Sequence, residues 1–294
     1  MPELISKVQH KTYEKGEFSD EKPRSLDDTI SLIKDFPWDA ERTLTDIQLT
    51  GPSVTIKDED LNYLKIGLFF NGKFCLYYLD NESHLYEYHA PTIEDVCSIV
   101  TDFFNEGLDL QKFEKKTFSL GSRKHFENGY FEYTLNKTWN SLYILFAFAI
   151  LIPIMIVTVV IALASMYWLM PLYLILDLLY IQGIYFMVMV SLRSRNLSLN
   201  ITNGQDYFQF GNEDDRQQYD KKDISEINIS GQTSRSLKTF NLMNIVFKDG
   251  TIITIPGVII EPFLFASKFP GYKITYINGY IKGLKALWKY IKNK

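Results

Sequence analysis

The sequence predicts a membrane protein in which a two-helix transmembrane hairpin lies between an N-terminal α+β domain and a C-terminal, mainly antiparallel β domain with a terminal helix. Three observations predict this class: a mostly apolar central run, mixed helix and strand patterns before it, and short strands separated by turns after it. The expected parts are a flexible arm (1–24), an α+β domain (25–120), a hairpin or linker (121–140), the transmembrane hairpin (141–192) and the β domain (193–294).

The central run, Leu142–Leu192, is long enough for two membrane crossings. Asp177 is its only charge, and one crossing needs about 20 consecutive apolar residues. Pro171 divides the run, so we expect helices over about 142–164 and 171–192, joined by a short turn. The alternative is a buried soluble hairpin, but a soluble helix normally shows a polar face and neither of these does.

Basic residues near the run predict its orientation. Arg123, Lys124 and Lys137 precede the first span, Arg193 and Arg195 follow the second, and the turn between the spans carries no charge. Cytoplasmic flanks carry the excess of Lys and Arg. We therefore expect a multi-pass protein of the inner (plasma) membrane with both termini in the cytoplasm. The first 24 residues lack the apolar core of a signal peptide.

Composition and motifs argue against several function classes. The net charge is −4, and no basic run interleaved with aromatic residues indicates a nucleic-acid partner. Cys75 and Cys97 lack metal-ligand spacing and are expected to be buried thiols, and the four histidines are scattered along the chain. No phosphate-binding loop, nucleophile elbow or Ser/His/Asp arrangement is visible. We expect no cofactor, no metal, no catalytic residue and no enzymatic activity.

The N-terminal domain has clear local signals. Ser25 is expected to begin a helix that ends before Pro37. Asn71-Gly72 supplies the positive φ angles of a tight turn, so Leu61–Leu79 reads as a β-hairpin. Thr92, with Asp95 three residues on, predicts the start of a second helix. Further strands are expected at Leu44–Leu49, Val54–Ile56 and His84–Tyr88, and a hairpin around Asn128-Gly129.

Acidic side chains on this domain predict a docking face for a basic protein partner. The residues are Asp58, Glu59, Asp60 and Glu87. The alternative is an ordinary solvated surface.

The C-terminal domain alternates strands and turns. Strands are expected at Leu197–Ile201, Tyr207–Phe210 and Ile224–Ile229, with a polar loop at Gly231–Ser236. Asp249-Gly250 predicts a hairpin between Phe240–Phe247 and Thr251–Ile255. A terminal helix is expected from about Thr275. Its exposed face carries four lysines that could contact an anionic membrane, or could simply face water while the helix covers the sheet: Lys282, Lys285, Lys289 and Lys292.

These residues carry a resemblance. A strand entered through Asp223-Ile224, then a strand, Asp-Gly, a strand and Ile-Pro, resembles the bacterial pleckstrin-homology-like (PH-like) domains, which often adjoin a two-helix membrane hairpin. It covers about Asn196–Lys294 and the strand Tyr130–Leu135, although the Trp that the family usually carries near Ile224 is missing. The resemblance implies binding of a protein or a lipid headgroup. Residues 1–120 are vaguely similar to small immunity proteins.

Polar residues within the spans suggest contacts inside the membrane. A charge in a span is costly and marks a functional site by default. Asp177 could bond the facing helix near Thr158, and Gln182 and Gly183 suit helix–helix contact or a homo-oligomer.

Three hypotheses for the whole chain follow. The first is a non-enzymatic protein that tethers cytoplasmic binding modules to the membrane, with membrane lipid and a protein partner as ligands. The second is an immunity or defence protein that neutralises a toxin at the inner membrane. The third is an oligomeric channel or transporter subunit that uses Asp177.

Overall fold

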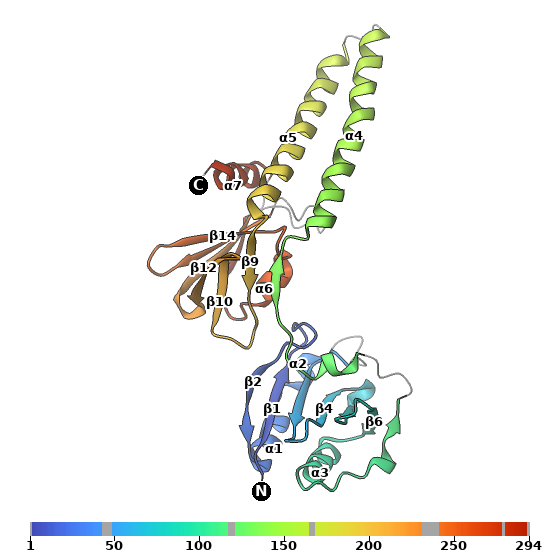
Figure 1. Ribbon diagram of the computed structural model, residues 1–294. Helices are drawn as coiled ribbons and strands as arrows, with labels where there is room; N and C mark the ends of the chain where they lie inside the picture. Colours follow the sequence, from blue (N-terminus) through green and yellow to red (C-terminus); the bar gives the residue numbers. More distant parts are fainter. Residues whose placement is uncertain are drawn as a thin grey trace. The chain divides into compact units, whose positions relative to one another are not determined.

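The computed structural model describes residues 2–42, 49–116, 121–164, 168–230, 241–277 and 280–292 (Figure 1). The chain forms two compact units. The first contains Met1–Tyr130 with Thr202–Gln205, and the second contains Phe131–Ile201 with Asp206–Lys294. The predicted loop Gly231–Ser236, the start of the turn after the first span, and all of the predicted strand Leu44–Leu49 except its last residue lie outside the described residues.

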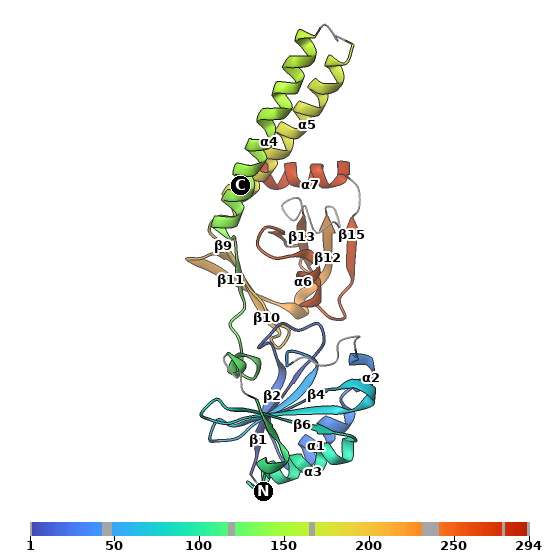
Figure 2. The ribbon, with the colours of Figure 1, turned by 90° about the vertical axis from the view of Figure 1, so that its right-hand side faces the viewer.

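The first unit is a seven-stranded sheet covered on one face by two helices. The strand order is β2-β1-β3-β4-β5-β6-β7, and all described pairs are antiparallel. Helices α1 and α3 lie side by side against the sheet, over the main apolar core (Figure 2). The elements are β1 (Leu4–Gln9), β2 (Ser19–Arg24), α1 (Leu26–Asp35), α2 (Trp38–Glu41), β3 (Ser53–Lys57), β4 (Tyr63–Leu68), β5 (Phe74–Leu79), β6 (Leu85–Ala90), α3 (Ile93–Phe104) and β7 (Glu114–Lys115).

The prediction of a flexible arm over residues 1–24 is wrong. β1 pairs with both β2 and β3 and so lies inside the sheet. Leu4 and Val8 join the apolar core, whereas Lys7 and Gln9 are buried on the opposite face. Because both faces of β1 are covered, the strand lacks the polar–apolar alternation that marks a half-exposed strand. The α+β domain therefore begins near the start of the chain, not at Ser25.

Predictions that rest on neighbouring residues are confirmed. Asn71 and Gly72 have φ angles of +56° and +78° in the turn between β4 and β5. Ser25 accepts a hydrogen bond from the backbone N–H of Asp28 and begins α1. Thr92 begins α3 with a reciprocal capping box, in which its hydroxyl accepts from the backbone N–H of Asp95 at 3.2 Å.

The second unit joins two four-stranded sheets to a long helical hairpin. The sheet orders are β11-β10-β9-β8 and β14-β13-β12-β15, and their inner faces share one apolar core with α6. Helices α4 and α5 run side by side (Figures 1 and 2). The elements are β8 (Glu132–Thr134), α4 (Lys137–Leu163), α5 (Met170–Ser194), β9 (Leu197–Asn200), β10 (Tyr207–Asn212), β11 (Asp215–Asp220), β12 (Ile224–Ser230), β13 (Leu242–Phe247), β14 (Ile252–Pro256), α6 (Pro262–Ser267), β15 (Ile274–Ile277) and α7 (Tyr280–Lys292).

Two predictions in this region are wrong for the same reason. The hairpin expected around Asn128-Gly129 does not form; β8 instead pairs with β9, on the other side of the long helices. The terminal helix begins at Tyr280 and not at Thr275, because Ile274–Ile277 pairs in parallel with β12. Both strands are short and have distant partners, so no local pattern predicts them. The polar edge strand β11 and the short helix α6 were not predicted either.

Candidate functional site

The strand pair β8–β9 positions the long helical hairpin. The two strands are antiparallel, with Tyr133 opposite Leu199. The chain leaves β8 into α4 and returns from α5 into β9, so a paired ladder holds the two helix ends together. Asn136 begins α4 by accepting a hydrogen bond from the backbone N–H of Trp139 at 3.1 Å.

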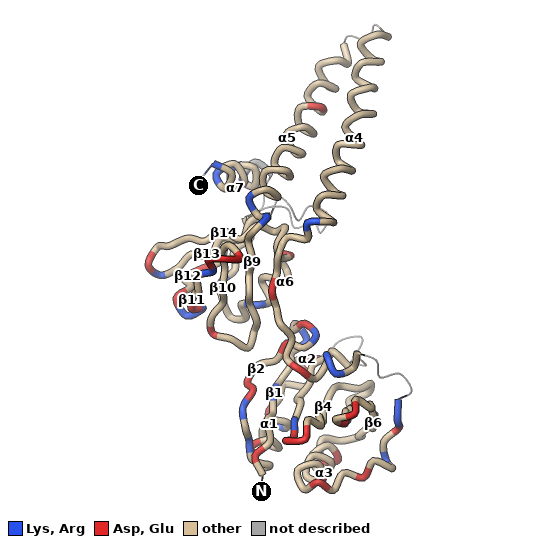
Figure 3. Tube along the Cα trace, in the orientation of Figure 1, with Lys and Arg blue, Asp and Glu red and all other residues tan. Residues whose placement is uncertain are grey.

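Cationic residues gather at this end of the hairpin and are absent from the rest of its described length (Figure 3). Lys137 opens α4, while Arg193 and Arg195 lie at the end of α5. Lys137 and Arg195 are exposed and form no salt bridge within the described part of the chain. Two positive charges are thus available to a ligand at the base of the hairpin.

A cavity of about 490 Å³ opens between α4 and α5 beside these cations. Its polar rim has Lys137 and Arg195, with Ser191 donating a hydrogen bond to Asn140 Oδ1 at 3.0 Å. Further along the helices, the lining becomes apolar. These apolar residues are Ile144, Phe148, Val188 and Leu192. The cleft, which we call the hairpin cleft, is therefore cationic at one end and greasy at the other.

Helix α7 lies across the base of the hairpin (Figure 2). Leu287 and Ile291 are buried against Phe186 and Val190 of α5. Arg193 Nη1 donates a hydrogen bond to the backbone carbonyl of Tyr290 at 2.6 Å, which ties the two helices together.

The rest of α7 faces outward. Trp288 is 44% exposed and lies 5.9 Å, centroid to centroid, from the ring of Phe186. The lysines predicted for a membrane-surface contact are all exposed on this helix: Lys282, Lys285, Lys289 and Lys292. α7 thus presents an apolar face to the protein and a cationic face outward, next to the hairpin.

A second cavity, of about 390 Å³, lies between α7 and the outer face of the neighbouring sheet. Asn228, Asn244 and Thr254 form a row across β12, β13 and β14, with Thr254 donating to Asn244 Oδ1 at 2.7 Å. Lys289 and Tyr290 of α7 complete its polar lining. Uncharged amide groups dominate this cavity, so it offers hydrogen bonds more than charge.

Comparison with known proteins bears on the unit that carries these features. The family model of the PH domain matches residues 130–268. These residues include a PH-like domain. The match begins at β8, so the PH-like domain starts before the helical hairpin and not at residue 193 as predicted from the sequence. No curated protein and no solved structure matches the chain.

The hairpin is therefore an insertion between the first two strands of the PH-like domain. The match extends through α6 and ends before β15 and α7. The domain and the hairpin share a sheet, because β8 and β9 pair directly at the point where the helices enter and leave. No flexible linker separates the domain from its two helices.

Within the hairpin, Asp177 bonds to the facing helix as predicted. Thr158 Oγ1 donates to Asp177 Oδ2 at 2.9 Å, and both side chains are buried. Asp177 Oδ1 has no hydrogen-bond partner within the described residues. Gln182, by contrast, is exposed, and the position where Gly183 would carry a Cβ is open. The predicted intramembrane polar residues thus separate into one inward contact and one outward-facing position.

The acidic residues predicted to dock a partner occupy two different settings in the first unit. Asp58 holds the β3–β4 turn by accepting hydrogen bonds from the backbone and the side chain of Asn62, both at 2.8 Å. Glu59 and Asp60 are exposed in the same turn. Glu87 lies on β6 and pairs with His89 and Lys116 instead. Glu87 therefore belongs to a side-chain cluster that the sequence did not reveal.

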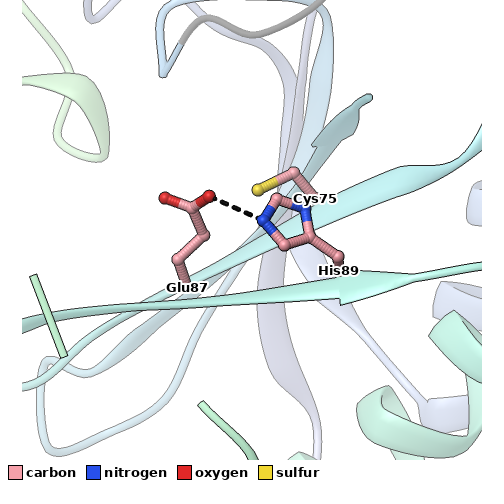
Figure 4. A group of neighbouring side chains, drawn as sticks. All are labelled: Cys75, Glu87 and His89. Atoms are coloured by element: carbon pink, nitrogen blue, oxygen red, sulfur yellow. Dashed lines mark ion pairs between the residues drawn. The ribbon is translucent and has the colours of Figure 1, made fainter. Parts of the chain in front are cut away.

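That cluster contains Cys75, Glu87 and His89 (Figure 4). The ligand atoms of the three side chains lie within 4.8 Å of one another, and His89 Nε2 is 3.0 Å from Glu87 Oε1. The expectation that Cys and His ligands stay scattered is wrong here, because pairing of β5 with β6 sets Cys75 opposite His89. Burial raises the pKa of the Cys75 thiol to about 12, which argues against a catalytic thiolate.

The same face of the first unit also buries two lysines. Lys65 Nζ donates to Gln9 Oε1 at 2.8 Å and to the backbone carbonyl of His125 at 3.0 Å. Burial lowers the pKa of Lys65 to about 7 and that of Lys7 to about 8. Burial also lowers the pKa of His125 to about 4. Alternation along β1 and β4 gives no hint of this polar interior, because the loops that cover it come from distant parts of the chain.

Proposed function

We propose that the chain is a non-enzymatic integral membrane protein that holds a PH-like domain and a second binding unit at the cytoplasmic face of the inner membrane. In this proposal the hairpin cleft binds the headgroup and upper acyl chain of an anionic phospholipid. The observation that carries it is the cleft itself, which is cationic at the sheet end and apolar along the helices.

The exposure of the long helices supports the membrane assignment. Only 6% of the most apolar window of α4, and 28% of that of α5, is buried within the chain. Leu145, Phe146 and Ile152 are 66%, 65% and 62% exposed. Removing each such side chain from water is worth about 1.5–3 kcal/mol, so a bilayer is the solvent that suits this surface. At 27 and 25 residues, both helices exceed the roughly 30 Å hydrocarbon layer at about 1.5 Å per residue.

The charge distribution supports the orientation. Lys137, Arg193 and Arg195 lie at the sheet end of the hairpin, and α7 adds four lysines at the same end. Anionic lipids of the cytoplasmic leaflet attract juxtamembrane cations by about 1 kcal/mol each. Trp288 on α7 suits the interface between headgroups and acyl chains. We therefore place the PH-like domain in the cytoplasm, against the lipid headgroups.

The mechanism is tethering. A domain held at the membrane meets membrane-bound partners at a higher effective concentration than a free one. The first unit then binds a protein partner of its own. The hydrogen bond between Thr158 and Asp177 supports a role for Asp177 in holding the hairpin together, in preference to an ion path.

A lipid-binding measurement tests the proposal. Purified protein in neutral detergent is titrated with a phosphatidylglycerol, a phosphatidylcholine of the same chains, or free glycerol phosphate, and complexes are counted by native mass spectrometry. We expect preferential retention of phosphatidylglycerol. The double variant K137Q/R195Q should weaken this binding by about 30-fold, from about 2 kcal/mol for two cations.

Lys124→Gln, which removes an exposed lysine of the first unit, is the matched control and should bind as the wild type does. Equal retention of both lipids, or unchanged binding by the double variant, would refute the cleft as a lipid site. Recovery of the protein in the soluble fraction without detergent would refute the membrane assignment as well.

A further inference from the structure

The side-chain cluster of the first unit has the composition of a metal site and is independent of the hairpin. Cys75 comes from β5, and Glu87 and His89 come from β6. Cys75 is directly opposite His89 in the antiparallel pair, and Glu87 is two residues before His89. Side chains two apart on a strand share a face, so all three project from the same side of the sheet (Figure 4).

We propose that Cys75, Glu87 and His89 bind a Zn²⁺ ion. Thiolate, imidazole and carboxylate are the three ligand types that zinc takes in proteins, and three protein ligands leave a fourth position for water or another ligand. The soft thiolate disfavours Mg²⁺ and Ca²⁺, which take oxygen ligands. The ion would replace the direct 3.0 Å contact between His89 Nε2 and Glu87 Oε1.

The surroundings of the cluster suit a dication. One thiolate and one carboxylate together balance its two charges. Lys116 Nζ lies 3.1 Å from the second carboxylate oxygen of Glu87, and the Tyr77 side chain is hydrogen-bonded to Cys75. Such outer partners orient the ligands of zinc sites.

Access to the cluster is one-sided. Cys75 is fully buried, whereas the His89 side chain is 42% exposed, so an ion can enter from the His89 side. The ring of Phe69 lies 4.2 Å from that of His89, centroid to centroid, and limits its movement.

Cobalt spectroscopy on the full-length protein in detergent tests the site. The protein is freed of metal with a chelator and titrated with Co²⁺. We expect one Co²⁺ per chain with a sulfur-to-cobalt charge-transfer absorption, and Zn²⁺ should displace it. Zn²⁺ should also raise the midpoint of thermal unfolding.

Variants assign the ligands. C75S should abolish the sulfur absorption, and E87Q and H89Q should each weaken Zn²⁺ binding by more than about tenfold. C75S changes a fully buried position, so H89Q, at a partly exposed side chain, serves as the independent test if C75S unfolds. H84Q is the control, because His84 pairs with Asp80 and lies outside the cluster. The proposal fails if the metal-free protein takes up no Co²⁺, if Co²⁺ binds without the sulfur absorption, or if H89Q binds Zn²⁺ as tightly as H84Q does.

Discussion

Lys65→Met tests whether the first unit buries a lysine that loses its charge near neutral pH. Lys65 is 1% exposed, and its pKa of about 7 compares with 10.5 for an exposed lysine. Between these values the unfolded chain holds a proton that the folded chain lacks. The free energy of unfolding must then rise with pH, because stability increases with pH wherever the unfolded state binds more protons.

The size of this effect follows from the two pKa values. From about pH 7 to about pH 9, Lys65 should add about 2 kcal/mol to the free energy of unfolding, at 1.36 kcal/mol per pKa unit. Lys7 contributes in the same direction, and its pKa of about 8 keeps part of the slope in the variant. The slope is the safer readout. The change also removes hydrogen bonds to Gln9 and the His125 carbonyl, and each buried group left without a partner costs about 1–3 kcal/mol at every pH.

Urea unfolding in detergent, followed by the fluorescence of Trp38, measures the slope. Trp38 is buried in the first unit, with its indole N–H donating to the Ile33 carbonyl at 2.7 Å. Replacing Trp139, Trp168 and Trp288 with Phe isolates its signal. Lys34→Met, at an exposed lysine of α1, controls for the loss of one positive charge. A pH slope that is equal in the Lys65 and Lys34 variants would refute the reasoning.

The remaining predictions use similar unfolding measurements. Gly72→Ala, at φ +78° with open space around it, should cost about 1 kcal/mol, whereas Gly16→Ala, at φ +76° with backbone atoms 3.0 Å away, should cost about 1–3 kcal/mol more; equal losses would show that crowding is relieved freely. Thr92→Ala removes the capping box of α3 and should cost about 1 kcal/mol, and an unchanged midpoint would contradict it. In mixed SDS micelles, Thr158→Val should destabilise the hairpin, and adding Asp177→Leu should restore it; a double variant worse than the single one would count against a structural pairing.

Features encoded by neighbouring residues could be predicted. The helices α4 and α5 follow from an apolar run interrupted at Pro171, and the β4–β5 hairpin follows from Asn71-Gly72. The contact between Asp177 and Thr158 could also be anticipated, because two antiparallel helices joined by a short turn align residues equidistant from it. The hairpin cleft was only partly foreseeable. Its cations stand beside the spans in sequence, but its polar rim depends on how the helices pack.

Other features depended on pairing between distant segments. β8 reads as part of a local hairpin until its partner is known to be β9, which lies beyond both long helices. The cluster of Cys75, Glu87 and His89 exists only because the register of β5 and β6 sets the thiol opposite the imidazole. A shift of one residue would send these side chains to opposite faces.

The amino-acid sequence by itself determined the two apolar helices, the turns and caps, and the excess of positive charge at one end of the hairpin. Each of these depends on interactions between residues a few positions apart. The tertiary structure alone decided that the hairpin is inserted between β8 and β9, that Lys65 is buried, and that three candidate zinc ligands meet. Those outcomes depend on which distant strand completes each hydrogen-bonding edge, and many sequences with the same local patterns could pair their strands differently.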